Sequence, residues 1–214
     1  MCNRYRLGES TQLKLFAKLR VEAPNISAVG EFRPTDRVTV IRQSGEERII
    51  EEMRWGFVPP WLTVSETKKL GPMTNARSDR VLESKIWKPA FLHRRCILPA
   101  TAYYEWQEVP GMKRKVPYAF TRKSGELFPF AGLWSEAHDD DGNPIHTCTI
   151  ITTDAASSVT HIHDRMPVIL PDETTELDLW LDPNNQQPES LLHLLKPFES
   201  EDLIYEQLPV GSVR

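Results

Sequence analysis

Alternating apolar and polar positions recur along the chain and predict a protein built mainly of β-strands. Residues 37–43 and 48–55 have this pattern on either side of Ser44-Gly45-Glu46, which predicts a hairpin. The same reasoning predicts further strands at residues 95–100, 102–106, 116–122, 129–137, 146–153, 168–170 and 203–208. Helical spacing of apolar residues predicts a helix at residues 10–20, with Ser10 as the cap. Further helices are predicted at 84–94, with an interruption near Pro89, and at 174–181 and 188–198.

The order of these segments favours an α+β protein with mostly antiparallel strands. Neither an internal repeat nor a low-complexity tract nor a convincing linker interrupts the 214 residues, so we expect a single domain over 1–214. Hydrophobic residues make up 40% and charged residues 26% of the chain, which is typical of a soluble globular protein.

No apolar run reaches the length of about 20 residues that a membrane-spanning helix needs, and the first residues lack the apolar core of a signal peptide. The three cysteines, Cys2, Cys96 and Cys148, form an odd set without framework spacing, which indicates reduced thiols. We therefore expect a cytoplasmic protein that does not bind membranes.

The net charge of -4 discourages a nucleic-acid-binding function, but the charges are unevenly distributed. Residues 1–130 hold 23 Lys and Arg against 14 Asp and Glu, a net of +9, whereas residues 131–214 hold 3 against 16, a net of −13. Such a chain can form a one-sided phosphate-binding face, although charges that lie far apart in sequence can also interleave in space.

Cys2 has unusual chemistry if Met1 is removed, because it then carries a free α-amine beside its thiol. Such groups titrate at about 7.7–8.0 and about 8.5, so both are partly nucleophilic near neutral pH. An aldehyde can react with the amine to form a Schiff base and then with the sulfur to close a thiazolidine ring. The alternative is an ordinary second residue on a frayed terminus.

Two other features are candidates for function. Glu105 lies in an aromatic strand, where alternation places it on the same face as Tyr103. An apolar setting there would raise the pKa of Glu105 toward the range useful for proton transfer. The alternative is an outward-facing Glu on an edge strand. The rigid aromatic segment 55–61 could stack bases if exposed, or fill the core.

Motifs of other site classes are missing: the chain has no Gly-rich phosphate loop, no nucleophile-elbow Ser motif and no Cys or His pair at metal-ligand spacing. We therefore expect neither a metal nor a cofactor. What remains is Cys2, Asn75, Glu105 and His163, which are scattered along the chain and which spacing alone could not select.

Several blocks together resemble the SRAP family, the SOS-response-associated peptidases or abasic-site processing proteins. They occur in the family's order and cover nearly the whole chain: residues 1–5 (MCNRY), 55–61 (WGFVPPW), 75–78 (NARS), 94–100 (RRCILPA) with 104–106 (YEW), 130–134 (FAGLW), 151–155 (ITTDA) and 163–167 (HDRMP). Tyr103-Tyr104 departs from the expected smaller residue followed by an aromatic one, which affects local packing only. The resemblance implies a barrel-like β core with peripheral helices.

The resemblance also implies an activity: binding single-stranded DNA and crosslinking to abasic sites through Cys2. Carried over residue by residue, Cys2 is the amine and thiolate nucleophile, and Asn75 positions the terminus or the opened sugar. Glu105 is the general acid and base, and His163 assists proton transfer during Schiff-base formation. Lyase activity and removal of the N-terminal residue by the protein itself are implied side reactions.

For DNA binding, the resemblance implies phosphate contacts from Arg4, Arg77 and Arg165, and stacking or wedging by Trp55, Phe57 and Pro34. The expected partner is single-stranded DNA with abasic sites, and we expect a monomer that joins the nucleoid on damage. Two alternatives stay open: a cysteine peptidase with His163 as the base for Cys2, and a non-catalytic single-strand binder.

Overall fold

The computed structural model describes residues 2–8, 13–21, 29–71 and 73–213. Met1, the predicted cap Ser10 and the first residues of the predicted helix at 10–20 lie outside the described residues.

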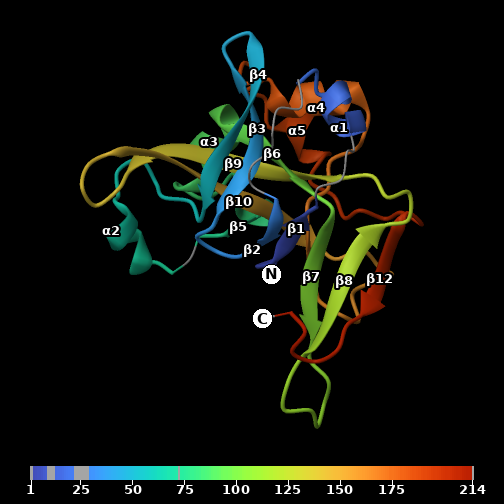
Figure 1. Cartoon of the computed structure of the whole chain (residues 1–214). Helices are drawn as coiled ribbons and strands as arrows, with labels where there is room; N and C mark the ends of the chain where they lie inside the picture. Colours follow the sequence, from blue (N-terminus) through green and yellow to red (C-terminus); the bar gives the residue numbers. More distant parts are fainter. Residues whose placement is uncertain (1, 9–12, 22–28, 72, 214) are drawn as a thin grey trace.

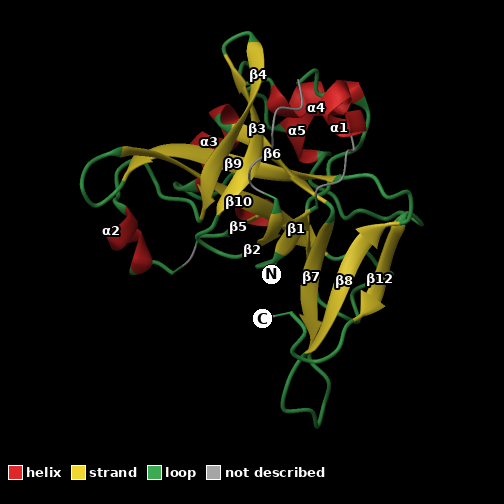
Figure 2. Ribbon diagram, viewed as in Figure 1, coloured by secondary structure: helices red, strands yellow, loops and turns green. Residues whose placement is uncertain are grey.

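The central feature is a ring of β-strands that closes on itself (Figures 1 and 2). Its members are β3 (Arg37–Ser44), β4 (Glu47–Trp55), β6 (Arg95–Ala100), β9 (Phe128–His138) and β10 (Pro144–Asp154). Antiparallel pairing joins β4 to β3, β3 to β6, β6 to β9 and β9 to β10, and a short parallel pairing of β10 with β4 closes the ring. This ring confirms the expected barrel-like core with mostly antiparallel pairing.

The far end of β10 extends beyond this closure and holds two short strands. β5 (Asn75–Arg77) pairs with it in parallel, with Ile150 opposite Asn75, and β11 (Arg165–Pro167) pairs with it in antiparallel orientation, with Asp154 opposite Arg165. Segments that lie almost ninety residues apart in sequence are therefore brought to the same strand.

A second, antiparallel sheet lies beside the ring in the order β12 (Leu203–Gln207), β8 (Val116–Arg122), β7 (Ala102–Gln107), β1 (Tyr5–Leu7) and β2 (Gly30–Phe32). Only Thr101 separates β7 from β6 of the ring, so the chain passes directly from one sheet to the other. The long connection between β7 and β8 projects away from the rest of the molecule (Figure 1).

The helices are short and peripheral, as expected (Figure 2). They are α1 (Leu13–Lys18), α2 (Val64–Lys68), α3 (Trp87–His93), α4 (Thr174–Leu181) and α5 (Glu189–Leu192), with a 3-10 turn at Ser78–Arg80. A capping box starts α2: Thr63 accepts from the Glu66 backbone, and the Glu66 carboxylate accepts from the Thr63 N–H. No helix in the described ranges is long and apolar enough to cross a membrane.

Some sequence-based boundaries are wrong. In place of the strand predicted at 168–170, β11 covers the three preceding residues, and Ile169 makes only an isolated bridge with Phe130. The helix predicted at 188–198 is reduced to α5 followed by turns. Pro89 does not interrupt α3, because it lies in the first turn, where backbone N–H groups need no intrahelical acceptor. The three-residue strands β1, β2 and β5 and the short helix α2 were not predicted, since segments this short carry no periodic signal.

Candidate functional site

The segment before β1 is held firmly on the second sheet. The Arg4 carbonyl accepts a hydrogen bond from the Tyr104 N–H at 3.0 Å, and Tyr5 pairs with Tyr103 of β7 and with Phe32 of β2. Cys2 is fully buried, and its Sγ lies 3.8 Å from the same Arg4 carbonyl. The alternative of a frayed terminus is therefore wrong.

Burial controls the chemistry of the Cys2 thiol. It raises the thiol pKa well above the ordinary value, and the nearby negative charge of Glu105 raises it further. The thiol is consequently neutral in this structure, so it becomes a nucleophile only by giving its proton to a base.

Glu105 is the main titratable group beside Cys2. It is only 2% exposed, because β7 turns it to the inner face that it shares with Tyr103. Burial raises the pKa of this carboxyl to about 7. The outward-facing alternative is therefore wrong, and near neutral pH the group can both donate and accept a proton.

His163 faces the same carboxylate from the loop that leads into β11. Its Nε2 lies 3.7 Å from Glu105 Oε2, and its Nδ1 accepts a hydrogen bond from the Arg165 backbone N–H at 3.0 Å. Asp164 Oδ1 also lies 3.1 Å from Nδ1, but this side chain is 88% exposed, so we assign the proton to Nε2, facing Glu105. Burial lowers the pKa of His163, which favours the neutral ring.

Asn75 reaches the site from β5 through the residue next to Cys2. Its Nδ2 donates to Asn3 Oδ1 at 3.1 Å, and the Thr74 hydroxyl donates to the same oxygen at 2.9 Å. Asn75 Oδ1 is buried and has no hydrogen-bond partner within the described residues. Asn3 was given no role from the sequence, although it belongs to the matched block 1–5, which was a usable signal.

The predicted phosphate-binding arginines all carry carboxylate partners. Arg77 makes two hydrogen bonds to Asp79 at 3.0 and 2.8 Å, and these lower the pKa of Asp79. Arg165 is buried and lies 2.6 Å from Asp154, and Arg4 is buried and lies 3.4 Å from Glu31. Their positive charges are therefore largely compensated.

The prediction of stacking by Trp55 and Phe57 is wrong for this structure. Both rings are buried: the Trp55 Nε1 donates to the Thr74 carbonyl at 3.0 Å, and Phe57 packs edge-on against Trp87 with centroids 4.9 Å apart. Trp61, in the same aromatic segment, is 59% exposed and is the ring that a base could contact. Pro34 is half-buried in the tight turn before β3.

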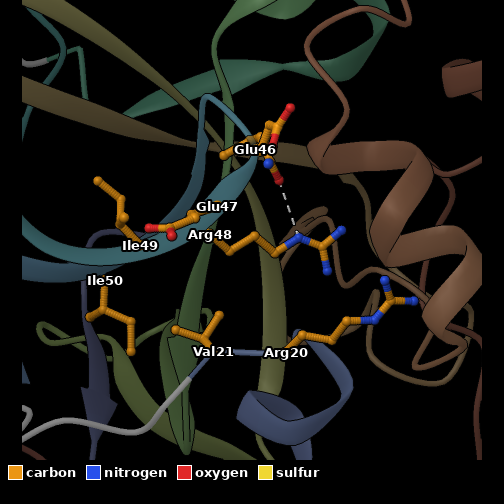
Figure 3. Close-up of a pocket in the computed structure, with 8 residues that line it drawn as sticks. Arg20, Val21, Glu46, Glu47, Arg48, Ile49 and Ile50 are labelled. Carbon is orange, nitrogen blue, oxygen red and sulfur yellow. Dashed lines mark hydrogen bonds between the residues drawn. The ribbon is translucent and has the colours of Figure 1, made fainter.

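One of the surface hollows adjoins the candidate site. A polar hollow of about 340 Å³ opens beside His163 and is lined also by Gln107, Lys115 and His161. Another, of about 860 Å³, lies at the β3–β4 turn (Figure 3). There Arg48 and Arg20 are paired with Asp178 of α4, and no thiol lines the hollow, so we assign no chemistry to it. No group of three or more His, Cys, Asp or Glu among the described residues could hold a metal ion.

Comparison with known proteins identifies relatives of this chain. Residues 1–211 match the family described as SOS response associated peptidase (SRAP). The abasic site processing protein YoqW of Bacillus subtilis (strain 168) is 39% identical over 171 residues, covering 79% of this chain and 74% of that protein. The abasic site processing protein HMCES of Rattus norvegicus is 33% identical over 180 residues, covering 72% of this chain and 51% of that protein. The crystal structure of a Bacteroides thetaiotaomicron protein has a TM-score of 0.83 at 26% identity and covers 97% of this chain and 92% of its own.

Proposed function

Because the chain belongs to the SOS response associated peptidase (SRAP) family, we propose that it processes abasic sites in DNA by binding single-stranded DNA and crosslinking to the lesion through Cys2. The names of the relatives YoqW and HMCES support a function at abasic sites. The observation that carries the proposal is the convergence of Cys2, Asn75, Glu105 and His163 from four distant segments. We place this activity in the cytoplasm, at the damaged nucleoid.

The first chemical requirement is removal of Met1, which converts the Cys2 nitrogen from an amide into a primary amine. An abasic deoxyribose opens from its ring form to an aldehyde: protonated Glu105 would donate a proton to the ring oxygen as its bond to C1 breaks, and the C1 hydroxyl would release its proton to water. The Cys2 amine adds to the aldehyde carbon, and loss of water gives a Schiff base.

The thiol then completes the crosslink. Glu105, now ionised, would take the proton of the buried Cys2 thiol as the sulfur adds to the Schiff-base carbon to close a five-membered thiazolidine. The Schiff-base nitrogen takes up a proton in the same step, so that the thiol hydrogen is replaced by the ring N–H. His163, with its proton on Nε2, would exchange protons with Glu105, and Asn75 would hold the N-terminal segment in place through Asn3. If the Schiff base persists, β-elimination of the strand competes with ring closure as a lyase reaction.

The peptidase alternative has weaker support. A cysteine peptidase relies on a thiolate stabilised by a neighbouring histidine, whereas burial keeps the Cys2 thiol neutral and His163 lies against Glu105. We therefore limit peptidase chemistry in the proposal to removal of Met1.

The central test uses protein whose loss of Met1 has been verified by intact mass. Incubated with single-stranded DNA that contains one abasic site, the wild type should give an adduct that survives denaturing electrophoresis without a reductant. Cys2→Ala keeps the amine but lacks the sulfur, so it should give an adduct only when borohydride traps the Schiff base. No wild-type adduct, or a stable adduct in Cys2→Ala without borohydride, would contradict the proposal.

The ion pair of Arg77 provides a second prediction. Asp79→Asn removes the carboxylate that compensates Arg77, so we expect noncovalent affinity for single-stranded DNA to rise about threefold at low salt and the gain to vanish at high salt. Fluorescence anisotropy with undamaged DNA measures this. Asp141→Asn, an equal charge change in the exposed β9–β10 turn, is the control and should have little effect.

A further inference from the structure

The connection between β7 and β8 carries three consecutive cations, Lys113, Arg114 and Lys115, all exposed. Its tip is a tight turn in which the Met112 N–H donates to the Val109 carbonyl at 3.1 Å. Pro110 occupies the second position of this turn and Gly111, with a φ of 85°, the third, which is the pattern of a type II turn. The turn fixes the backbone of residues 109–112, and the three cations follow it on the return toward β8.

The hairpin that β7 and β8 form with their connection at residues 108–115 lies next to the candidate site. Pairing of Gln107 with Val116 places Lys115 directly at the base of the hairpin, and Lys115 lines the same 340 Å³ hollow as His163. Gln107 Nε2 also donates to the His161 carbonyl at 2.8 Å, which ties β7 to the other wall of the hollow. A strand that leaves the site on the side of His163 would therefore pass along the hairpin.

The charges on the hairpin differ in their compensation. Lys115 Nζ lies 2.5 Å from Glu108 Oε1, so its charge is partly compensated. Lys113 and Arg114 make no ion pair with any residue in the described ranges, in contrast to Arg4, Arg77 and Arg165. Arg114 lies beside the C-terminal segment, where a Cβ added at Gly211 would be 3.7 Å from its Nη1.

We propose that Lys113 and Arg114 bind backbone phosphates of the single strand that flanks the abasic nucleotide on the His163 side of the site. The inference rests on the proposed function and adds a binding element outside the residues that the family resemblance supplied. Lys and Arg side chains that neutralise phosphates release the counterions condensed on the DNA, and Lys113 and Arg114 can do so without first breaking an ion pair to another described residue. Lys113 and Arg114 act in binding and positioning, at a distance from the reacting atoms.

The double variant Lys113→Gln/Arg114→Gln tests this in the full-length protein without Met1. Its affinity for undamaged single-stranded DNA, measured by anisotropy, should fall about tenfold at low salt, and the slope of log affinity against log salt should shrink by about 1.4, which is 0.7 per lost phosphate contact. The crosslinking rate at saturating abasic DNA should stay unchanged, while the DNA concentration for half the maximal rate rises. The charge-matched control is Lys123→Gln/Lys196→Gln; both residues are exposed, and Lys123 lies at the opposite end of β8.

Truncated DNA identifies the flank. Two DNA strands are compared, one ending directly 5′ and one directly 3′ of the abasic nucleotide. One of the two should abolish the difference between wild type and the hairpin variant in the DNA concentration that gives half the maximal crosslinking rate. If neither does, or if hairpin and control variants lose equal affinity and slope, the proposal for the hairpin is wrong. A wild type that forms no adduct contradicts the proposed function instead, and the anisotropy measurements on undamaged DNA remain interpretable without it.

Discussion

Replacing Glu105 with Gln should slow crosslink formation by about 10²–10⁴-fold, the usual contribution of a general acid or base. Gln has nearly the same shape but neither donates nor accepts a proton as an acid does, so binding of DNA should persist. Single-turnover rates at saturating abasic DNA, with anisotropy on undamaged DNA as the control for binding, separate the two effects. An equal loss of both would indicate that Glu105 is structural.

The pH dependence sharpens this prediction. The pKa of Glu105 is about 7, so the acid form that assists ring opening is lost as pH rises above 7, while the unprotonated Cys2 amine, with an ordinary pKa of about 7.7–8.0, is gained. The wild-type rate should therefore pass through a maximum between these values. Glu105→Gln should lack the fall on the alkaline side, and a wild-type rate that only rises up to pH 9 would contradict an acid role for Glu105.

The same carboxyl is expected to make the folded chain less stable above pH 7 than at acid pH. Its pKa in the folded state, about 7, lies above the ordinary 4.5, so the folded chain holds a proton that the unfolded chain has released, and stability falls as pH rises from 4.5 to 7. Glu105→Gln should thus raise the free energy of unfolding by about 1–3 kcal/mol at pH 8 and change it little at pH 4. Denaturant unfolding at both pH values measures the difference.

Replacing Arg95 with Met should lower the free energy of unfolding by about 3–5 kcal/mol and the melting temperature by roughly 10 °C. The guanidinium is buried, and burial lowers its pKa to about 10. It donates to five backbone carbonyls near the ends of α3 and α4, those of Phe91, Leu92, Trp180, Asp182 and Asn185. Met would leave these carbonyls without donors in a buried place.

Two further variants make this measurement specific. Arg95→Lys keeps a charge but has fewer donors in a different geometry, so it should lose an intermediate amount of stability. Arg94→Met changes the neighbouring arginine, whose guanidinium lies 5.8 Å from the Trp134 ring centroid and is half-buried, and should cost less than about 1 kcal/mol. Equal losses for Arg94→Met and Arg95→Met would contradict the bridging role of Arg95.

The predictable part of the fold consists of elements long enough to carry a periodic signal. The hairpin of β3 and β4 was found because eight and nine residues flank a Gly turn, and β6 to β10 were found for similar reasons. Closure of the ring was implied only by the family resemblance, since the β10–β4 pairing involves two residue pairs far apart in sequence. Strands of three residues such as β5, which carries Asn75, depend on that tertiary pairing for their existence.

The candidate site likewise has properties that the sequence determines and properties that depend on the fold. The sequence alone determined which reactive groups the chain has: an aminothiol at Cys2 once Met1 is removed, and a carboxylate within an aromatic strand at Glu105. Only the tertiary structure decided their protonation and accessibility, because burial and neighbouring charges are properties of the folded chain. It placed Trp55 and Phe57 in the core, exposed Trp61, compensated the charges of Arg77 and Arg165, and left those of Lys113 and Arg114 uncompensated among the described residues.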